Sequence, residues 1–304
     1  MRRIGGNKKR LDEANQKGII AAINRSQAVI EFTLDGKILH ANENFLNALG
    51  YSLEEIVGQH HAMFVDPAYA QSSDYAQFWN NLRAGQSQAQ EFRRIGKGGK
   101  EIWIQASYNP VFDAAGKPFK VVKFATDITA QKRIAADHAG QIKAISKAQA
   151  VIEFKLDGSI LTANENFCNA LGYRLEEIEG KHHSMFVEPD YARSEDYRDF
   201  WRKLAAGEYQ AAEYKRIGRG GKEVWIQASY NPIFDASGKP FKVVKYATDV
   251  TARKRAVSEI GAVLGALASA DLTPRVTGDY QGEFARLKED TNRVAEGFTD
   301  IMTK

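Results

Sequence analysis

The sequence predicts an α+β protein made of two copies of one small domain, with helical segments around them. The first observation is a repeat: residues 28–133 return as residues 150–255, 122 positions later and without a gap. About three quarters of the paired residues are identical. The second observation is that each copy mixes strand-like and helix-like segments. A unit of about 106 residues has the size of an ordinary domain and exceeds the roughly 20–50 residues of a solenoid repeat.

Within one copy, the patterns predict two strands, several helices and three further strands. Residues 29–39 have the composition of two strands joined by the Asp35-Gly36 turn. Asn42 stands where a helix could be capped, and apolar residues follow it at helical spacing. The later elements are a short helix at 53–56, a turn or short helix at 60–65, a longer helix at 74–84, and strands at 88–95, 101–109 and 119–126.

The segments outside the repeat are predicted to be helical. They are an N-terminal helix at 1–27, a linker helix at 134–149 and a tail at 256–304. The linker carries Ile134, His138, Ile142 and Ile145 at near-heptad spacing, which favours a coiled coil or a helix packed on its own domain. The tail contains two apolar stripes separated by a connector, so we expect a helix, a connector and a second helix.

Composition excludes several classes of protein. The net charge of +4 is too weak and dispersed to indicate a nucleic-acid partner. The one cysteine, Cys168, cannot form a disulfide within the chain, which fits a reducing compartment. No apolar stretch approaches the roughly 18–20 residues that cross a membrane, so we expect a cytoplasmic protein without a membrane span. Hydrolase, kinase and metalloprotease signatures are missing from the sequence, so we expect no enzymatic activity.

Two pairs of adjacent histidines are the first candidate site residues. They are His60-His61 in the first copy and His182-His183 in the second. Adjacent residues of a helix point about 100° apart, so we expect one histidine of each pair to face inward. A neutral imidazole can ligate iron or donate to a flavin or a phosphate. The alternative is a hydrogen-bonded pair that closes a helix cap.

Further candidates lie on the long helix and on the central strands. Trp79 and Trp201 fit either core packing or a flat wall stacked on a planar cofactor. Strand 101–109 alternates, which places Ile104 and Tyr108 on the face toward the helices. Arg94 shares this inner face, and a buried arginine needs an anionic partner. The second copy repeats these three positions as Ile226, Tyr230 and Arg216.

Several motifs resemble those of PAS domains. They are Leu34-Asp35-Gly36, Ala41-Asn42, Leu49-Gly50-Tyr51, Glu54-Glu55-Ile56-Val57-Gly58, Gly98-Gly99-Lys100 and Asp127-Ile128-Thr129, with counterparts in the second copy. The resemblance covers both repeats. It implies two PAS domains, each a five-stranded antiparallel sheet with helices on one face and a small cavity between them. In the tail, Asp271-Leu272-Thr273 and Gly282-Glu283-Phe284 resemble a HAMP segment, which implies a parallel dimer that forms a four-helix bundle.

Tandem PAS domains followed by HAMP resemble soluble methyl-accepting chemotaxis proteins of the aerotaxis and biofilm-dispersal type. The resemblance implies a homodimeric sensory input module that detects redox state or oxygen. It would relay the signal through HAMP to a kinase-control domain that contacts the chemotaxis kinase and adaptor. Since the coiled-coil hairpin of that class is absent, we expect a fragment of a longer receptor. The alternatives are a cofactor-free dimerisation and relay module, or the input half of a histidine kinase or diguanylate cyclase.

The resemblance also implies a cofactor, FAD or haem b, with one in each PAS domain. The aerotaxis family has Arg-His-Pro-Asp where this chain has Val65-Asp66-Pro67, which counts against FAD. The histidine pairs count for haem, but the long helix has no histidine, so FAD and haem both stay open. The histidines would be metal ligands only if the cofactor is haem. The expected cofactor-binding residues are Asn42, His60, His61, Trp79, Arg94, Ile104 and Tyr108, and in the second copy Asn164, His182, His183, Trp201, Arg216, Ile226 and Tyr230.

Overall fold

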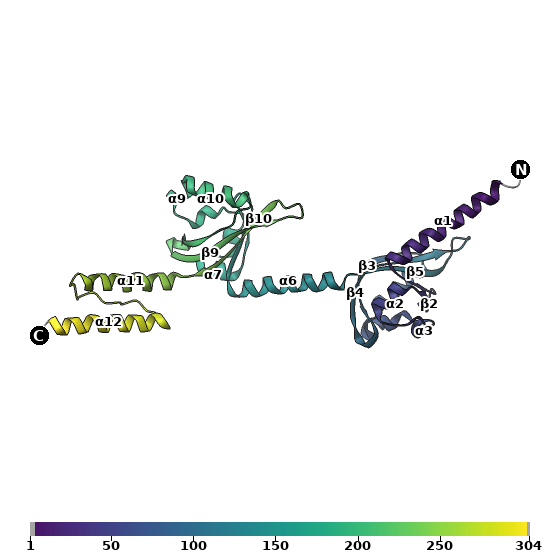
Figure 1. The fold of residues 1–304 in the computed structure, drawn as a ribbon, viewed down its shortest axis with the longest axis horizontal. Coiled ribbons are helices and arrows are strands. Elements are labelled where there is room, and N and C mark those ends of the chain that lie inside the picture. The colour runs from purple at the N-terminus through teal and green to yellow at the C-terminus, as the bar shows by residue number, and fades with distance from the viewer. Residues whose placement is uncertain (1–3, 303–304) are drawn as a thin grey trace. The chain divides into compact units, whose positions relative to one another are not determined.

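The structure, a computed structural model, describes residues 4–302. The chain divides into two compact units, residues 1–139 and 140–304, and each contains one five-stranded antiparallel sheet (Figure 1). The predicted order of two strands, helices and three strands is confirmed in both. Among residues 4–302, no helix combines the length and apolarity that a membrane crossing requires.

The first unit begins with α1 (Ile4–Ser26) and forms a sheet of order β2-β1-β5-β4-β3. Short helices cross from the second strand to the third, and α6 (Thr129–Ala148) follows the last strand. The elements between α1 and α6 are β1 (Ala28–Phe32), β2 (Ile38–Ala41), α2 (Glu43–Leu49), α3 (Leu53–Ile56), the 3-10 helix η1 (His61–Phe64), α4 (Pro67–Ala70), α5 (Ser73–Arg83), β3 (Gln88–Ile95), the 3-10 turn η2 (Lys97–Gly99), β4 (Glu101–Phe112) and β5 (Pro118–Asp127).

The second unit repeats this architecture with sheet order β7-β6-β10-β9-β8. Its elements are β6 (Ala150–Phe154), β7 (Ile160–Ala163), α7 (Glu165–Leu171), α8 (Leu175–Ile178), η3 (His183–Phe186), α9 (Pro189–Arg193), α10 (Glu195–Ala205), β8 (Gln210–Ile217), η4 (Arg219–Gly221), β9 (Glu223–Phe234) and β10 (Pro240–Asp249). Two helices follow, α11 (Thr251–Ala268) and α12 (Glu283–Met302).

The core of each sheet domain lies between one face of the sheet and the helices. Strand β4 alternates as the sequence predicts, and Ile102, Ile104, Ala106 and Tyr108 are buried. Apolar residues of α2 and α5 cover this face, because their helical spacing gathers them on one side. Phe45 and Leu82 are examples, exposed by 1% and 0%. Burial of these side chains supplies the main driving force for folding.

Asn42 connects three elements of the first domain. Its side-chain oxygen caps α2 by accepting a hydrogen bond from the backbone N–H of Phe45 at 3.0 Å. The same oxygen accepts from the backbone N–H of Val29, in β1, at 2.9 Å. Its amide group donates to the carbonyl of Gln27 at 2.8 Å, just after α1. Asn164 makes the corresponding bonds in the second domain. The predicted cap is confirmed, and each asparagine also fixes the helix that precedes its sheet.

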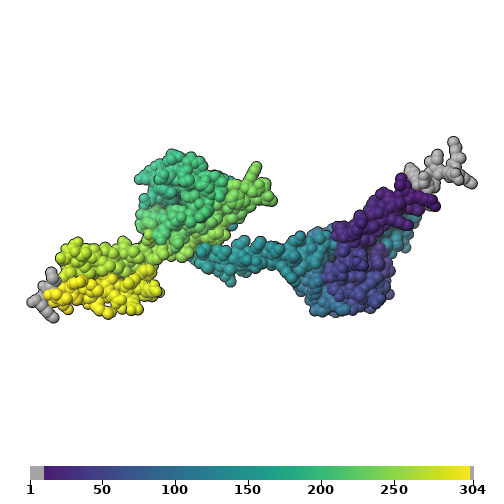
Figure 2. All heavy atoms as spheres, viewed as in Figure 1, coloured from purple at the N-terminus to yellow at the C-terminus, as the bar shows by residue number. Residues whose placement is uncertain are grey.

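The connector between the C-terminal helices is fixed to α11 through Glu259. Helix α12 runs in the same direction as α11, and an extended connector returns from the end of α11 to the start of α12 (Figure 1). The two helices lie side by side (Figure 2). The Glu259 carboxylate accepts hydrogen bonds from the backbone N–H of Thr277 at 2.6 Å and of Gly278 at 3.1 Å, and from the Tyr280 hydroxyl. The Tyr280 hydrogen bond and these amides lower the pKa of Glu259 to about 2.

We predict that acid loosens this connector through Glu259. Because the folded pKa lies below the ordinary value of 4.5, the stabilisation is complete above pH 4.5 and is lost as the pH falls toward 2. Hydrogen exchange of the Thr277 and Gly278 amides, corrected for intrinsic rates, should show protection falling across this window. Glu259→Gln should remove that pH dependence, whereas Glu289→Gln, an exposed carboxylate on α12, should leave it unchanged. Constant protection in the wild-type chain would contradict the prediction.

Candidate ligand site

A buried polar cluster lies between the sheet and helix α5 in the first domain. Its members come from five elements: His61 from η1, Tyr75 from α5, Arg94 from β3, Tyr108 from β4 and Lys123 from β5. Their exposed fractions are 0%, 6%, 4%, 0% and 1%. The second domain repeats the cluster as His183, Tyr197, Arg216, Tyr230 and Lys245.

Hydrogen bonds join four members of the cluster in a chain. His61 Nδ1 lies 2.8 Å from the Tyr75 hydroxyl, and His61 Nε2 lies 2.9 Å from the Tyr108 hydroxyl. Arg94 Nη2 donates to the same Tyr108 oxygen at 3.0 Å. Burial and the nearby Arg94 charge hold the pKa of His61 well below its ordinary value, so the imidazole is neutral. A neutral imidazole has one donor and one acceptor nitrogen, and both are engaged here.

The other histidine of the pair, His60, shapes the backbone around it. Its Nε2–H donates to the carbonyl of Asp35 at 2.7 Å, and its Nδ1 accepts from the N–H of Ala62 at 3.1 Å. The ring therefore caps η1 and holds the turn between β1 and β2. His182 does the same in the second domain. The expected division into one inward and one outward histidine is confirmed, and the outward residue closes a helix cap.

The positive groups of the cluster lack a counter-ion. Arg94 Nη1 donates to the carbonyl of Arg93 at 2.8 Å, while its Nε has no hydrogen-bond partner. Lys123 Nζ lies over the rings of Phe45 and Tyr108, at 5.3 and 5.0 Å from their centroids. Burial and the Arg94 charge hold the pKa of Lys123 well below its ordinary value. Among the described residues, no aspartate or glutamate is buried.

Trp79 is packed into the aromatic core. Its ring meets Phe32 and Phe78 edge-on, with centroids 5.8 and 5.7 Å apart, and only 4% of the residue is exposed. Its indole N–H lies near Tyr75 without reaching hydrogen-bond geometry. Gly36, at φ 83°, lies directly over the ring, since a Cβ there would come within 2.9 Å of Trp79. Trp201 occupies the same position under Gly158.

The remaining predicted site residues also have defined places. Ile104 and Ile226 lie on the inner faces of β4 and β9, exposed by 2% and 4%. Asn42 and Asn164 use their side chains as caps. The sequence interpretation missed Tyr75 and Lys123 and their counterparts Tyr197 and Lys245. The alternation of Val121, Lys123 and Ala125 along β5 is the signal that could have placed the lysine inside.

These residues do not fit haem or a flavin ring as they are packed. An axial ligand of haem needs a free histidine nitrogen, and both nitrogens of His60, His61, His182 and His183 are hydrogen-bonded. The described part of the chain contains no group of three or more metal-ligating side chains. Aromatic rings occupy the space that a planar cofactor would need. The ring centroids of Phe78 and Tyr108 are 4.9 Å apart, and those of Phe32 and His61 are 5.4 Å apart.

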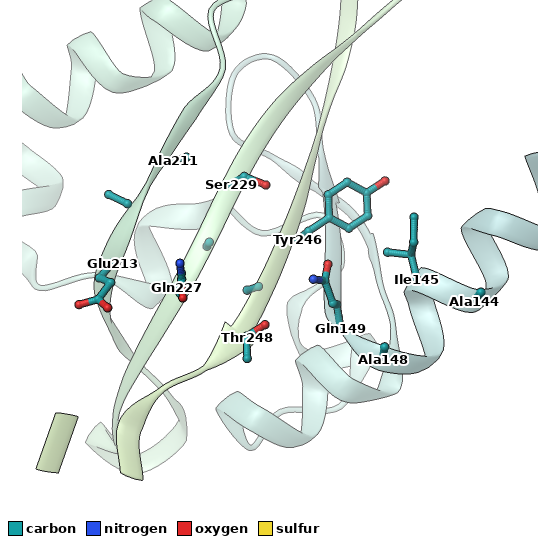
Figure 3. Close-up of a pocket in the computed structure, with 13 residues that line it drawn as sticks. Ala144, Ile145, Ala148, Gln149, Ala211, Glu213, Gln227, Ser229, Tyr246 and Thr248 are labelled. Atoms are coloured by element: carbon teal, nitrogen blue, oxygen red, sulfur yellow. The ribbon is translucent and has the colours of Figure 1, made fainter. Parts of the chain in front are cut away.

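One surface pocket reaches the cluster. It has a volume of about 350 Å³ and is lined by Arg94 and Phe92 of β3 and by Val65, Asp66 and Tyr69 near α4, among others. A hollow of about 1050 Å³ in the second unit lies elsewhere, on the outer face of β8, β9 and β10 beside α6 (Figure 3). Alanines and uncharged polar side chains dominate that hollow, and it includes none of the predicted site residues. Of these two pockets, the smaller one is lined by Arg94, a buried cation of the cluster.

We predict that Tyr108→Phe destabilises the first domain by about 2–4 kcal/mol. The change removes one hydroxyl and leaves His61 Nε2 and a second Arg94 donor buried without partners. Urea unfolding followed by tryptophan fluorescence measures the loss. Tyr51→Phe is the matched control, because the Tyr51 ring packs on Phe64 and its hydroxyl makes no hydrogen bond among the described residues. Equal stability of both variants would show that the network contributes little.

The curated proteins that are similar to this chain include three bacterial proteins. The biofilm dispersion protein BdlA of Pseudomonas aeruginosa is 46% identical over 236 residues, which is 78% of this chain and 57% of that protein. The oxygen sensor protein DosP of Escherichia coli is 24% identical over 72% of this chain and 28% of that protein. The aerotaxis receptor of Escherichia coli is 31% identical over 26% of this chain and 15% of that protein. The chain thus spans less than two thirds of the length of each relative.

A family match agrees with the topology of both sheets. The profile of the PAS fold matches twice, over residues 38–125 and 160–247, which together make up more than half of the 304 residues. Each match begins at the second strand of one sheet and extends into its last strand. The five-stranded antiparallel order and the helices on one face are those expected from the motifs. The chain therefore belongs to the PAS fold family.

Proposed function

We propose that this chain is the sensory input module of a chemotaxis receptor. A change inside a PAS domain would alter the helix that leaves its sheet, and the helices would pass the signal to a kinase-control domain. Two of the relatives, a biofilm dispersion protein and an aerotaxis receptor, support a role in bacterial behaviour. The module itself would signal without catalysing a reaction.

The junction between each sheet and its exit helix is the observation that carries this proposal. The Thr129 hydroxyl, at the start of α6, accepts a hydrogen bond from the backbone N–H of Trp103 at 2.9 Å. Asp127, at the end of β5, accepts from the N–H of Thr129 at 2.8 Å. Thr251, Trp225 and Asp249 repeat the junction at α11. Because β4 and β9 also carry Tyr108 and Tyr230, each exit helix is bonded to the strand that lines the buried cluster.

The C-terminal helices support a homodimer that relays the signal in the manner of a HAMP segment. Their apolar side chains are exposed along both helices, by 48% at Leu264, 50% at Phe298 and 72% at Ile301. Two parallel helices cannot bury such stripes alone, whereas a second copy would cover them in a four-helix bundle. A chemotaxis kinase and adaptor would then be contacted by a domain beyond these helices.

Oxygen or redox sensing through a bound cofactor is the second candidate function. The printed names of two relatives, the oxygen sensor protein and the aerotaxis receptor, favour it. The packing of the cluster does not fit haem or flavin, so this function would require the core to open. The alternatives of a cofactor-free dimerisation module, or of the input half of a kinase or cyclase, share the same junctions.

We predict that Thr251→Val uncouples the second PAS domain from α11. The substitution keeps the shape of the side chain and removes the hydroxyl that accepts from Trp225. A fusion of residues 1–304 to the kinase-control domain of a chemotaxis receptor should set a tumbling bias in receptorless cells that Thr251→Val shifts. Thr248→Val, the same change at an exposed position of β10, is the control. An identical bias for the fusion, for Thr251→Val and for a fusion lacking residues 1–250 would refute the proposal.

We also predict that the purified protein is colourless. An absorbance spectrum recorded before and after dithionite distinguishes the candidates. Haem would give a sharp band near ~410 nm that shifts on reduction, and flavin would give bands near ~370 and ~450 nm that bleach. Either spectrum at one equivalent per domain would show that the core opens to admit a cofactor and would favour the second candidate.

A further inference from the structure

We propose that strand β3 of the first PAS domain pairs with β3 of a second copy of this chain, antiparallel and in a register centred on Phe92. The two five-stranded sheets then join edge to edge into one continuous sheet. This contact goes beyond the proposed function, and it is separate from the contact made by the C-terminal helices.

The two edges of the first sheet differ. At one edge, β2 is bonded to the segment that follows α3. The N–H of Ile38 donates to the carbonyl of Gln59 at 2.8 Å, and the carbonyl of Ile38 accepts from the N–H of Gly58 at 2.9 Å. At the other edge, β3 pairs with β4 alone among the described strands. An uncovered edge strand is a template for a further strand.

The backbone groups of alternate β3 residues point out of the sheet. Trp103 of β4 directs its backbone N–H and carbonyl away from β3, into hydrogen bonds of 2.9 and 2.8 Å around the start of α6. Arg93 lies opposite Trp103, so this pair exchanges no hydrogen bonds, and the alternation of an antiparallel ladder extends the same to Glu91 and Ala89. The N–H groups of these three β3 residues have no acceptor among the described residues.

The edge of β3 is accessible to another strand. Its exposed residues are Ala89, Gln90, Glu91 and Arg93. A groove of about 350 Å³ is lined by residues 90–95 on one side and by residues near α4 on the other. The Arg93 side chain stays on its own hairpin, where it binds Glu101 at 2.6 Å. The Arg93 carbonyl accepts one hydrogen bond from Arg94 Nη1, and its second lone pair is available to a partner strand.

The side chains of β3 are self-complementary about Phe92. A register centred there sets Glu91 of each copy opposite Arg93 of the other, so that two pairs of opposite charge form. A register centred on Glu91 or on Arg93 would instead set like charges directly opposite, which is destabilising. Because Glu91 also binds Lys132 and Arg93 also binds Glu101, positive and negative groups alternate across the contact. This charge complementarity indicates a second copy of the strand as the occupant.

The corresponding edge of the second domain is closed. Lys215 of β8 takes the place of Arg93, and it binds Glu188 and Glu223, both at 2.9 Å. Glu188 corresponds to Asp66, which lines the groove beside β3 in the first domain. The ion pair with Glu188 therefore spans the equivalent groove, and a partner strand would have to break it. We expect pairing at β3 and not at β8.

Disulfide cross-linking of the full chain tests the register. Ala89→Cys together with Ile95→Cys, in a Cys168→Ser background, sets the two cysteines opposite each other across the contact, with Cα atoms about 5.5 Å apart. Within one chain the two positions are about 20 Å apart and cannot form a disulfide. Mild oxidation should yield a cross-linked dimer. Ala211→Cys together with Ile217→Cys, at the same positions of β8, is the matched control and should yield little.

Charge reversal tests the complementarity in the same cysteine background. Arg93→Glu sets two pairs of glutamates opposite each other and should slow cross-linking about tenfold, and Glu91→Arg should do the same with arginines. Co-expression of the two variant chains should restore cross-linking between them, because every opposed pair then has opposite charges. This rescue also shows that neither substitution unfolds the domain.

Hydrogen exchange supplies a measurement on the wild-type chain. The N–H groups of Glu91 and Arg93 should be as protected as those of Gln90 and Phe92, which bond to β4. Fast exchange at Glu91 and Arg93 beside slow exchange at Phe92 would show an edge that its charges keep unpaired, and would overturn the proposal. Cross-linking that Arg93→Glu leaves unchanged would overturn it as well.

Discussion

The hydroxyl group of Tyr108 is the constraint on which the first PAS domain depends. It comes from β4 and bonds both the imidazole of His61 and the guanidinium of Arg94. His61 in turn reaches Tyr75 on α5, so one chain of hydrogen bonds joins the sheet to the helical layer. In a medium of low dielectric constant such bonds are directional and costly to leave unmade. Burial of the apolar core brings the sheet and the helical layer together, and this hydrogen-bond network fixes their relative position.

Much of this arrangement could be predicted from the sequence. The alternation of strand 101–109 placed Ile104 and Tyr108 inside, and the position of Asn42 before a helical pattern identified a cap. The strand is longer than predicted and ends at Phe112. β3 pairs with β4 only up to Tyr108, so beyond that point β4 has a partner on one side and tolerates Pro110.

The part that could not be predicted is the content of the core. Lys123 violates the expectation that inner positions of a strand are apolar, and its place becomes evident only when Phe45 and Tyr108 are seen around Nζ. The histidine pairs were interpreted as possible iron ligands because spacing alone cannot reveal a partner far along the chain. Tyr75 and Tyr108 are 14 and 47 residues from His61, and they occupy both ring nitrogens.

The buried lysine couples the folding of the first domain to the pH of the surroundings. In the folded domain, burial and the charge of Arg94 hold the pKa of Lys123 well below its ordinary value, while His61, Tyr75 and Tyr108 face the cluster as uncharged groups. Unfolding returns the amine to water and to its ordinary pKa, so the unfolded chain binds more protons than the folded one. The contribution of Lys123 to the free energy of unfolding therefore becomes more favourable to the folded state as the pH rises. Keeping this amine dry costs most in acid and least in mildly alkaline solution.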